Sequence, residues 1–151
     1  MTHRPEGRRP GREEGNISLF VLGVLVSLLV VIGLAMDGSK KFQAASDATF
    51  YAQQAALTGD QALNVAGYLS NGTVDLDPQA AVAAADAYLA TPSLAAAGVT
   101  GSAILLNPTT LQVTVTITRP TEFLGLIGIP TQTVTASATA ALLHGVTTPE
   151  R

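Results

Sequence analysis

Residue types that could carry chemistry are scarce in this sequence. Of its 151 residues only two are histidines, His3 and His144, and both stand near the ends of the chain; there is no cysteine. A catalytic Ser-His-Asp triad needs a histidine placed between two partners, and a zinc-thiolate site or disulfide needs cysteine, so none of these is expected. We interpret His144 as a solvated residue at the end of a strand.

The acidic residues do not form a recognisable site either. Asp75 and Asp77 resemble the start of a calcium-binding loop, but the glycine and glutamate that such a loop requires do not follow. Asp77 stands directly before Pro78 and is better explained as the cap of a helix. Asp60 and Asp86 are expected to be single surface carboxylates. We therefore predict no catalytic residue, no metal site and no cofactor, and a function other than catalysis.

Composition excludes another class of partner. The chain has a net charge of −3, and only 13% of its residues are charged, against about 25% in an average soluble domain. Nucleic-acid binding normally requires a basic face, which this composition does not provide. We expect no nucleic-acid partner.

One uncharged segment dominates the N-terminal part of the chain. It runs over residues 17–36, from Ile17 to Met36. As a helix rising 1.5 Å per residue it would be about 30 Å long, which matches the hydrocarbon core of a bilayer. A buried core helix would show a polar face, and this segment has none. We predict a membrane span, whose marked positions are Ile17, Phe20, Gly23, Ser27, Gly33 and Met36.

A cleaved signal peptide is the alternative to an uncleaved anchor. Gly33-Leu34-Ala35 could serve as a small-residue cleavage site. The apolar region of a signal peptide is typically about 7–15 residues long, and this segment is longer, so we prefer the anchor.

The flanking charges predict the orientation of the span. Four arginines precede it and two lysines follow it: Arg4, Arg8, Arg9, Arg12, Lys40 and Lys41. The excess of basic residues favours a cytoplasmic N-terminus, with the rest of the chain on the other side of the membrane.

The helical repeat continues beyond the span. Phe42, Ala45, Ala48, Ala52, Ala55 and Ala56 recur at spacings of three and four. No proline lies between Gly15 and Pro78. We expect one helix that leaves the membrane and runs to about Leu57, or to Leu69 with a weak point at Gly59.

The C-terminal half predicts a short helix and about three strands. Asn71-Gly72 indicates a turn, although Asn71-Gly72-Thr73 also matches a glycosylation acceptor. A short helix follows the Asp77-Pro78 start. Residues 102–106, 111–118 and 133–142 are the strand candidates, the last two with strict alternation. Between the last two, residues 123–129 form an apolar connection interrupted by glycine.

This order of elements predicts an α+β fold: a long N-terminal helix, a short helix and about three antiparallel strands. Alanines on the inner face of the last strand would let the long helix pack closely. The expected segments are a disordered cytoplasmic tail (1–15), a transmembrane helix (16–36), an extracytoplasmic helical stalk (37–70), a small α+β head (71–145) and a disordered tail (146–151).

The region around the span resembles the TadE/TadG-like proteins of tight-adherence (Flp) pilus assembly. The resemblance covers about residues 15–65. It rests on a glycine before the apolar span, an Asp-Gly pair where the span ends, and a Gln-Ala-Ala-x-Asp-Ala stretch after it. The matching residues are Gly15, Asp37, Gly38, Gln43 and Asp47.

The resemblance implies a pilin-like layout and a place in the cell envelope of a bacterium. It implies a structural or assembly role in a pilus, with membrane lipid and other Tad pilus-assembly or pilin-like proteins as partners. Some members are cut like prepilins after a glycine that has a glutamate five residues further on. Here that fifth residue after Gly15 is Phe20, which favours a TadG-like protein over a structural pilin. The remaining alternative is a secreted or surface-displayed binding module with a cleaved signal peptide.

Overall fold

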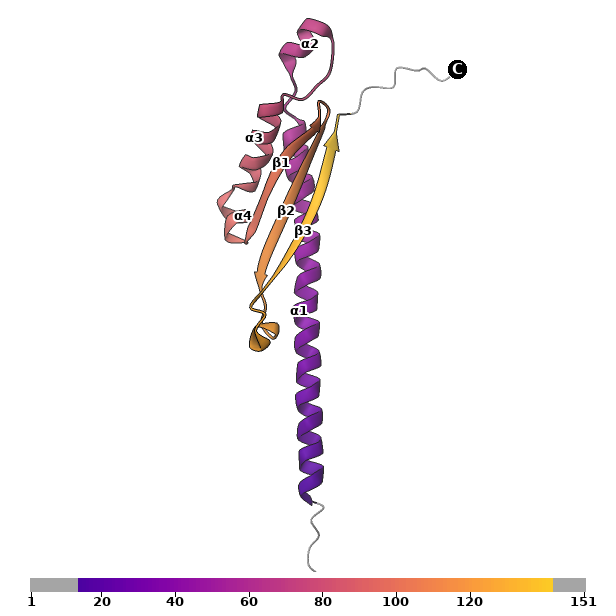
Figure 1. The fold of residues 1–151 in the computed structure, drawn as a ribbon, viewed down its shortest axis with the longest axis vertical. Coiled ribbons are helices and arrows are strands. Elements are labelled where there is room, and N and C mark those ends of the chain that lie inside the picture. The colour runs from indigo at the N-terminus through magenta and orange to yellow at the C-terminus, as the bar shows by residue number, and fades with distance from the viewer. Residues whose placement is uncertain (1–13, 143–151) are drawn as a thin grey trace, which may run out of the picture.

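A computed structural model describes residues 14–142, with side chains from residue 17 onward (Figure 1). Its main feature is one 47-residue helix, α1 (Glu14–Asp60), which runs without interruption through the apolar segment and into the head. The predicted continuous helix is confirmed. It ends one residue after Gly59, so the longer version reaching Leu69 is wrong.

Three short helices follow, α2 (Val65–Asn71), α3 (Pro78–Leu89) and α4 (Pro92–Ala96). Gly72 ends α2 with a positive φ of 73°, the left-handed conformation that glycine adopts without strain. The carboxylate of Asp77 accepts hydrogen bonds of 3.0 Å from the backbone N–H of Gln79 and Ala80. The predicted turn and the predicted helix cap are both confirmed.

The strands β1 (Val99–Asn107), β2 (Thr110–Pro120) and β3 (Thr131–Ala141) form one antiparallel sheet in the order β1-β2-β3. All three strands were predicted. β1 and β2 extend beyond their predicted limits at both ends, and β3 begins two residues earlier and ends one residue earlier than predicted. The fold is therefore α+β, as expected.

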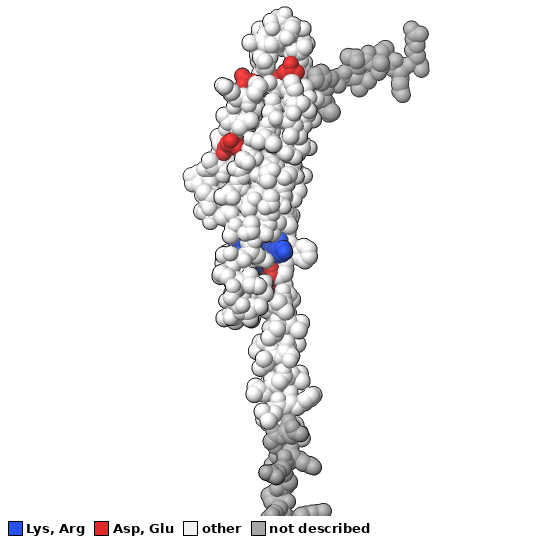
Figure 2. Space-filling model, in the orientation of Figure 1, with Lys and Arg blue, Asp and Glu red and all other residues white. Residues whose placement is uncertain are grey.

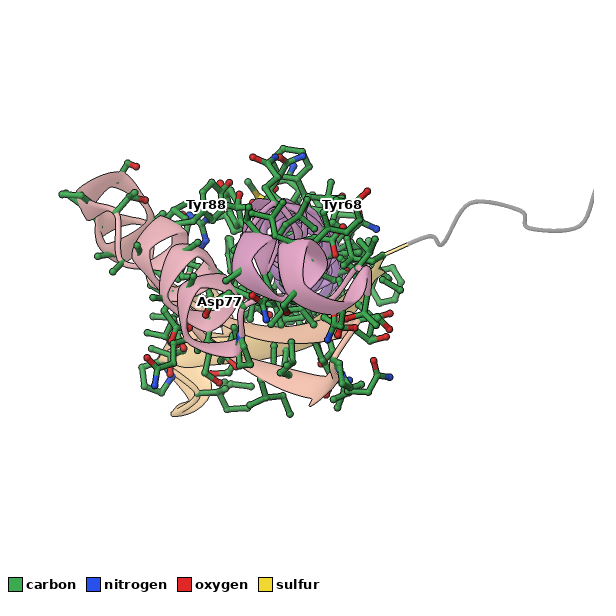
Figure 3. All side chains as sticks on the ribbon, turned by 90° about the horizontal axis from the view of Figure 1, so that it is seen from above. Tyr68, Asp77 and Tyr88 are labelled. Carbon is green, nitrogen blue, oxygen red and sulfur yellow. The ribbon has the colours of Figure 1, made fainter. Side chains whose placement is uncertain are left out.

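The core lies between one face of this sheet and the helices α1 and α3. Looking along α1, Figure 3 shows the helices gathered on one side of the sheet. The four inward side chains of β2 are fully buried: Leu111, Val113, Val115 and Ile117. The side of α1 that faces the sheet consists of buried alanines: Ala44, Ala48, Ala52, Ala55 and Ala56. Since alanine is small on both α1 and β3, the helix axis can lie close to the sheet.

Phe42 was predicted to share a helix face with Ala48 and Ala52, but it does not lie on the buried face of α1. Phe42 is 80% exposed. The buried face runs through Ala44 and Ala48, and Phe42 precedes Ala44 by two residues, which turns it by about 200° to the opposite side of a 3.6-residue helix.

Gly59 was predicted to be a weak point of α1, but it is a position where α3 and β2 approach the helix closely. It is buried, and a Cβ added there would overlap the side chain of Leu111 and lie 2.7 Å from the backbone oxygen of Ala81. The absence of a side chain lets α1 pass close to α3 and β2 just before it ends.

The other face of the sheet is open and rich in threonine. Hydroxyls pair across the strands at Thr114–Ser137 (3.0 Å) and Thr116–Thr135 (2.9 Å). Such cross-strand pairs fix the register on a face that no other described element covers.

Candidate functional site

The lower part of α1 extends beyond the head as an exposed apolar helix (Figure 1). Its large side chains over residues 17–36 are about half to three-quarters exposed, for example Phe20 at 72%. The hydroxyl of Ser27 donates to the backbone oxygen of Gly23 at 2.8 Å, so its polar group is satisfied within the helix. Within residues 17–142, α1 is the one helix that is long and apolar enough to cross a membrane.

Asp37 lies where this apolar segment meets the head, and it is almost fully buried, with 1% of its surface exposed. Its carboxylate accepts three backbone hydrogen bonds, from Glu122 (3.0 Å), Phe123 (3.0 Å) and Leu124 (2.7 Å). These residues begin the β2–β3 loop (residues 121–130), which contains the 3-10 helix η1 (Leu124–Ile127). Asp37 therefore caps a short helix that lies more than 80 residues further along the chain.

These contacts favour the ionised carboxylate. Hydrogen bonds from the backbone N–H of Glu122 and then Leu124 lower the pKa of Asp37 below its ordinary value of 3.8. Burial acts in the opposite direction, while the Phe123 N–H and the nearby Lys40 charge lower the pKa further. The carboxylate is thus charged at neutral pH, as a strong acceptor for these donors should be.

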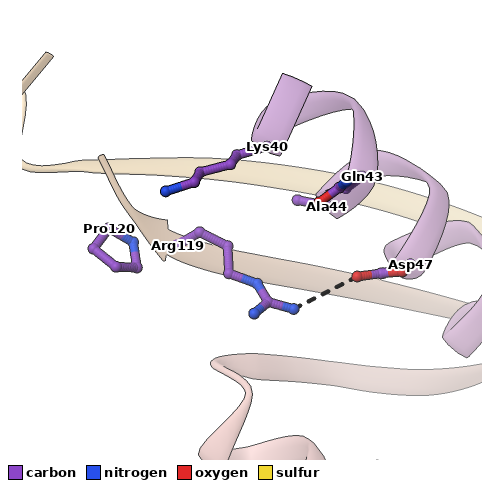
Figure 4. A pocket seen from close by; sticks show the side chains of 6 residues that line it. All are labelled: Lys40, Gln43, Ala44, Asp47, Arg119 and Pro120. Carbon is purple, nitrogen blue, oxygen red and sulfur yellow. Dashed lines mark ion pairs between the residues drawn. The ribbon is translucent and has the colours of Figure 1, made fainter. Parts of the chain in front are cut away.

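Two ion pairs reinforce the same junction. Lys40 of α1 pairs with Glu122 of the loop, and Asp47 of α1 pairs with Arg119 of β2 at 3.5 Å. Lys40, Gln43, Ala44, Asp47, Arg119 and Pro120 line an open hollow of about 280 Å³ between α1 and the end of β2 (Figure 4). Each pair is partly exposed, so we assign it an orienting role and little stability.

Gly33 provides the apolar part of the junction. It is buried, and a Cβ at this position would overlap the ring of Phe123. Gly33 and Asp37 lie one turn apart on the same face of α1, so the loop rests its aromatic ring on one and binds the carboxylate of the other.

Basic side chains gather at this same level. The described side chains include three basic ones, Lys40, Lys41 and Arg119, and Figure 2 shows the basic residues at the lower end of the head. Below them on α1, no charged residue occurs from Ile17 to Met36. The boundary between the charged and the apolar parts of the molecule is therefore sharp.

The remaining residues predicted from the family pattern have less marked surroundings. Gly15 lies in the first turn of α1. Gly38 has open space around its Cβ position, with no atom within 4 Å. Gly23 likewise has nothing within 4 Å, so no described residue uses the Gly23–Ser27 face for packing.

Two carboxylates differ from the expected solvated state. Asp86 is exposed but accepts a 3.0 Å hydrogen bond from the backbone N–H of Ala103, which ties α3 to the edge strand β1. Asp60, the last residue of α1, has a buried Oδ1 without a hydrogen-bond partner in the described part of the chain. Burial raises the pKa of Asp60.

No cluster of three or more metal-binding side chains occurs within the described residues. His3 and His144 lie outside them, as do the N-terminal arginines and the last residues of the predicted C-terminal tail.

Sequence reasoning singled out Asp37 but missed its partners. Arg119, Glu122 and the backbone of residues 122–124 carry no pattern that points to α1. The available signal was the position of Asp37 itself, an acidic residue directly after a 20-residue uncharged segment, where a charge is costly unless it is paired.

Comparison with family models gives a match to the N-terminal part of the chain. The model of the Tad family, described as "Putative Flp pilus-assembly TadE/G-like", matches residues 15–64. No curated protein matches the chain. No solved structure matches it either.

The match begins one residue after the start of α1 and ends four residues after its end. It contains Gly15, Asp37, Gly38, Gln43 and Asp47, the residues on which the resemblance was based, whereas Arg119 and Glu122 lie outside it. The resemblance is confirmed: residues 15–64 match the model of the TadE/G-like family of Flp pilus assembly.

Proposed function

We propose that this protein is a single-pass protein of a bacterial cell membrane with a structural or assembly role in a Tad/Flp-type pilus. Its N-terminus lies in the cytoplasm and its α+β head lies outside. The coincidence of the family match (15–64) with the one apolar helix (Glu14–Asp60) carries this proposal. Its partners are membrane lipid and other pilus-assembly or pilin-like proteins.

The packing of α1 supports a rigid connection between anchor and head. Residues beyond Met36 do not form a free stalk, because Ala44, Ala48 and Ala52 are buried in the core of the head. A force on the head would thus pass directly to the span. This suits a protein that holds or assembles a fibre at a membrane.

The junction also supports an uncleaved N-terminus over a cleaved signal peptide. Cleavage after Gly33-Leu34-Ala35 would separate Gly33 from Asp37, and these two residues hold the same loop. N-terminal sequencing of the mature protein distinguishes the alternatives. A start at Met1 or Thr2 supports the anchor. A start at Asn16 would indicate prepilin-like processing, and a start near Met36 would indicate a secreted binding module.

Deletion of the gene tests the pilus role directly. We expect fewer surface pili and weaker adhesion, restored by the wild-type gene expressed in trans. Pilus number and adhesion that remain unchanged after deletion would count against the proposal. Orientation is tested separately with Leu69→Cys, since the chain has no native cysteine and Leu69 is 79% exposed on α2. A membrane-impermeant thiol reagent should label it without cell lysis once the outer membrane, if present, is permeabilised.

A further inference from the structure

The β2–β3 loop carries an apolar tip that the head does not use. Leu126, Ile127 and Ile129 are 83%, 73% and 49% exposed, respectively. None of the residues from Leu124 to Pro130 is charged. Three large aliphatic side chains grouped on one short loop form an exposed apolar patch, the kind of surface that marks an interaction site.

This loop is attached to the apolar segment of α1 itself. Phe123 rests on Gly33, which lies three residues inside the end of that segment at Met36, or about 4.5 Å along the helix. Figure 1 shows the loop as the lowest part of the head, directly beside α1. If residues 17–36 cross the bilayer, the loop lies at the depth where the span enters it.

The loop backbone is prepared for an environment with little water. At least seven of the nine backbone N–H groups from Thr121 to Ile129 donate to acceptors within the protein, three of them to Asp37. The hydroxyl of Thr121 donates to the backbone oxygen of Ile129. Backbone groups that enter a membrane must be satisfied internally, because lipid offers no hydrogen-bond partners.

Charge limits how far the loop can enter. Lys40, Lys41 and Arg119 lie just above the loop, and Lys41 is exposed without an ion pair to any described residue. Basic side chains at this height can contact lipid phosphates while the aliphatic tip lies among the first carbons of the acyl chains. A penetration of about 5–10 Å is typical of interfacial elements.

We propose that the tip formed by Leu126, Ile127 and Ile129 inserts into the outer leaflet of the membrane as a second anchor beside α1. This inference rests on the proposed membrane span. It fixes the tilt of the head on the membrane surface, since a single span can tilt in the bilayer together with the head that is rigidly attached to it. Asp37 and Gly33 then serve to hold the loop against the span.

Labelling of single cysteines in the full-length protein tests this insertion. Leu126→Cys carries an environment-sensitive fluorophore, and the protein is reconstituted in vesicles of phosphatidylethanolamine and phosphatidylglycerol. Leu69→Cys on α2 is the matched control, because Leu69 is 79% exposed and lies at the far end of the head. Leu29→Cys, within the apolar segment and 61% exposed, reports on the span.

We expect a blue-shifted emission at Leu126→Cys, quenching by lipids with spin labels on the upper acyl chain, and protection from aqueous iodide. Leu69→Cys should show the reverse. Acyl-chain quenching at Leu29→Cys without quenching at Leu126→Cys would overturn the insertion and leave the span intact. Absence of quenching at Leu29→Cys would overturn the span, and with it the proposed function.

A protein occupant gives a different result. If a second copy of the chain covered the tip, Leu126→Cys would be protected from iodide without lipid quenching, and the protection would fall as the number of chains per vesicle is reduced. That outcome would overturn the proposal. Ile127→Cys repeats the measurement at a second exposed position, so a local effect of one substitution cannot decide it.

Discussion

At the residue scale, one buried carboxylate, that of Asp37, connects α1 to the β2–β3 loop. Asp37 is the only described charged side chain with almost no exposed surface, and the three hydrogen bonds to its carboxylate come from the β2–β3 loop. A buried carboxylate is tolerated when donors replace its water. Here the donors are the backbone N–H groups of residues 122–124, which lead into η1. Asp37 therefore links the TadE/G-like segment to a loop outside that segment.

Replacing this carboxylate should release the loop. In Asp37→Asn the amide nitrogen cannot accept the hydrogen bonds that one of the carboxylate oxygens accepted. We expect the amide protons of Glu122, Phe123 and Leu124 to lose most of their protection from hydrogen exchange, measured on the full-length protein in micelles. Asp47→Asn is the control: it removes only a partly exposed ion pair, so protection at these amides should persist. Equal loss in both variants would contradict the account.

Acid should have the same effect as that substitution. Because the folded-state pKa of Asp37 is lower than 3.8, its stabilising contribution is complete above that pH and is lost as the pH falls through the lowered value. The amide signals of residues 122–124 should therefore stay constant from neutral pH to about pH 5 and change only at strongly acidic pH. The neighbouring groups Lys40 and Glu122 form an exposed pair, so the transition must be absent in Asp37→Asn to be assigned to Asp37.

The charge of Asp60 should destabilise the folded protein, whereas the charge of Asp37 stabilises it. It is a partly buried carboxylate at the C-terminus of α1, where the helix dipole is unfavourable for negative charge. We expect Asp60→Asn to raise the free energy of unfolding by about 0.3–1 kcal/mol at neutral pH, measured by chemical denaturation. Since its pKa is raised, the cost of the charge disappears as the pH falls, and the advantage of the variant should shrink with it.

The same substitution at a helix N-cap provides the comparison. Asp77→Asn should change stability little, because asparagine caps a helix about as well as aspartate. A loss of stability in Asp60→Asn would show that the Asp60 carboxylate has a favourable partner, against the geometry described above.

At the element scale, α1 is one continuous helix whose lower and upper parts have different surfaces. Its lower part is apolar on all sides, and its upper part has a narrow face of alanines against β2 and β3. Glycines occur where another element crosses the helix closely, at Gly33 and Gly59, and also where none does, at Gly23 and Gly38. Substitution distinguishes the two groups.

Gly59→Ala should destabilise the head by about 1–3 kcal/mol, because the added methyl group would overlap Leu111 in a packed core. Gly38→Ala has open space and replaces a residue that is poorly suited to a helix interior, so it should be neutral or stabilising by up to about 1 kcal/mol. Urea denaturation followed by circular dichroism measures both. A Gly59→Ala variant as stable as Gly38→Ala would contradict the close crossing of α1, α3 and β2.

The elements with a strong local pattern were predictable from sequence. The uncharged run predicts the lower part of α1, the Asp77-Pro78 pair predicts the start of α3, and the Thr/Val and Thr/Ala alternations predict β2 and β3. The sequence could not predict which residues that are far apart in the chain contact one another in the fold. Asp37 and Glu122 are 85 residues apart, and the loop donates to the carboxylate through backbone N–H groups, which leave no mark on residue type. Phe42 was misplaced because alanine spacing fits two helix faces almost equally well.

At the scale of the whole molecule, the apolar segment and the head are one mechanical unit. α1 passes from the apolar segment into the core of the head without a break, and Asp37, Lys40 and Asp47 bind the lower end of the sheet to it. In the proposed orientation the head therefore stands at a fixed distance from the membrane. A protein that positions pilus components at a membrane needs such a fixed geometry.

The central claim is that the apolar part of α1 remains attached and holds the protein in the membrane. N-terminal sequencing of the mature protein, isolated from the membrane fraction of the native cell, tests it most directly. The account predicts a chain that begins before Ile17 and partitions with membranes. A mature protein that begins at or near Met36 and is released from the membrane would contradict it.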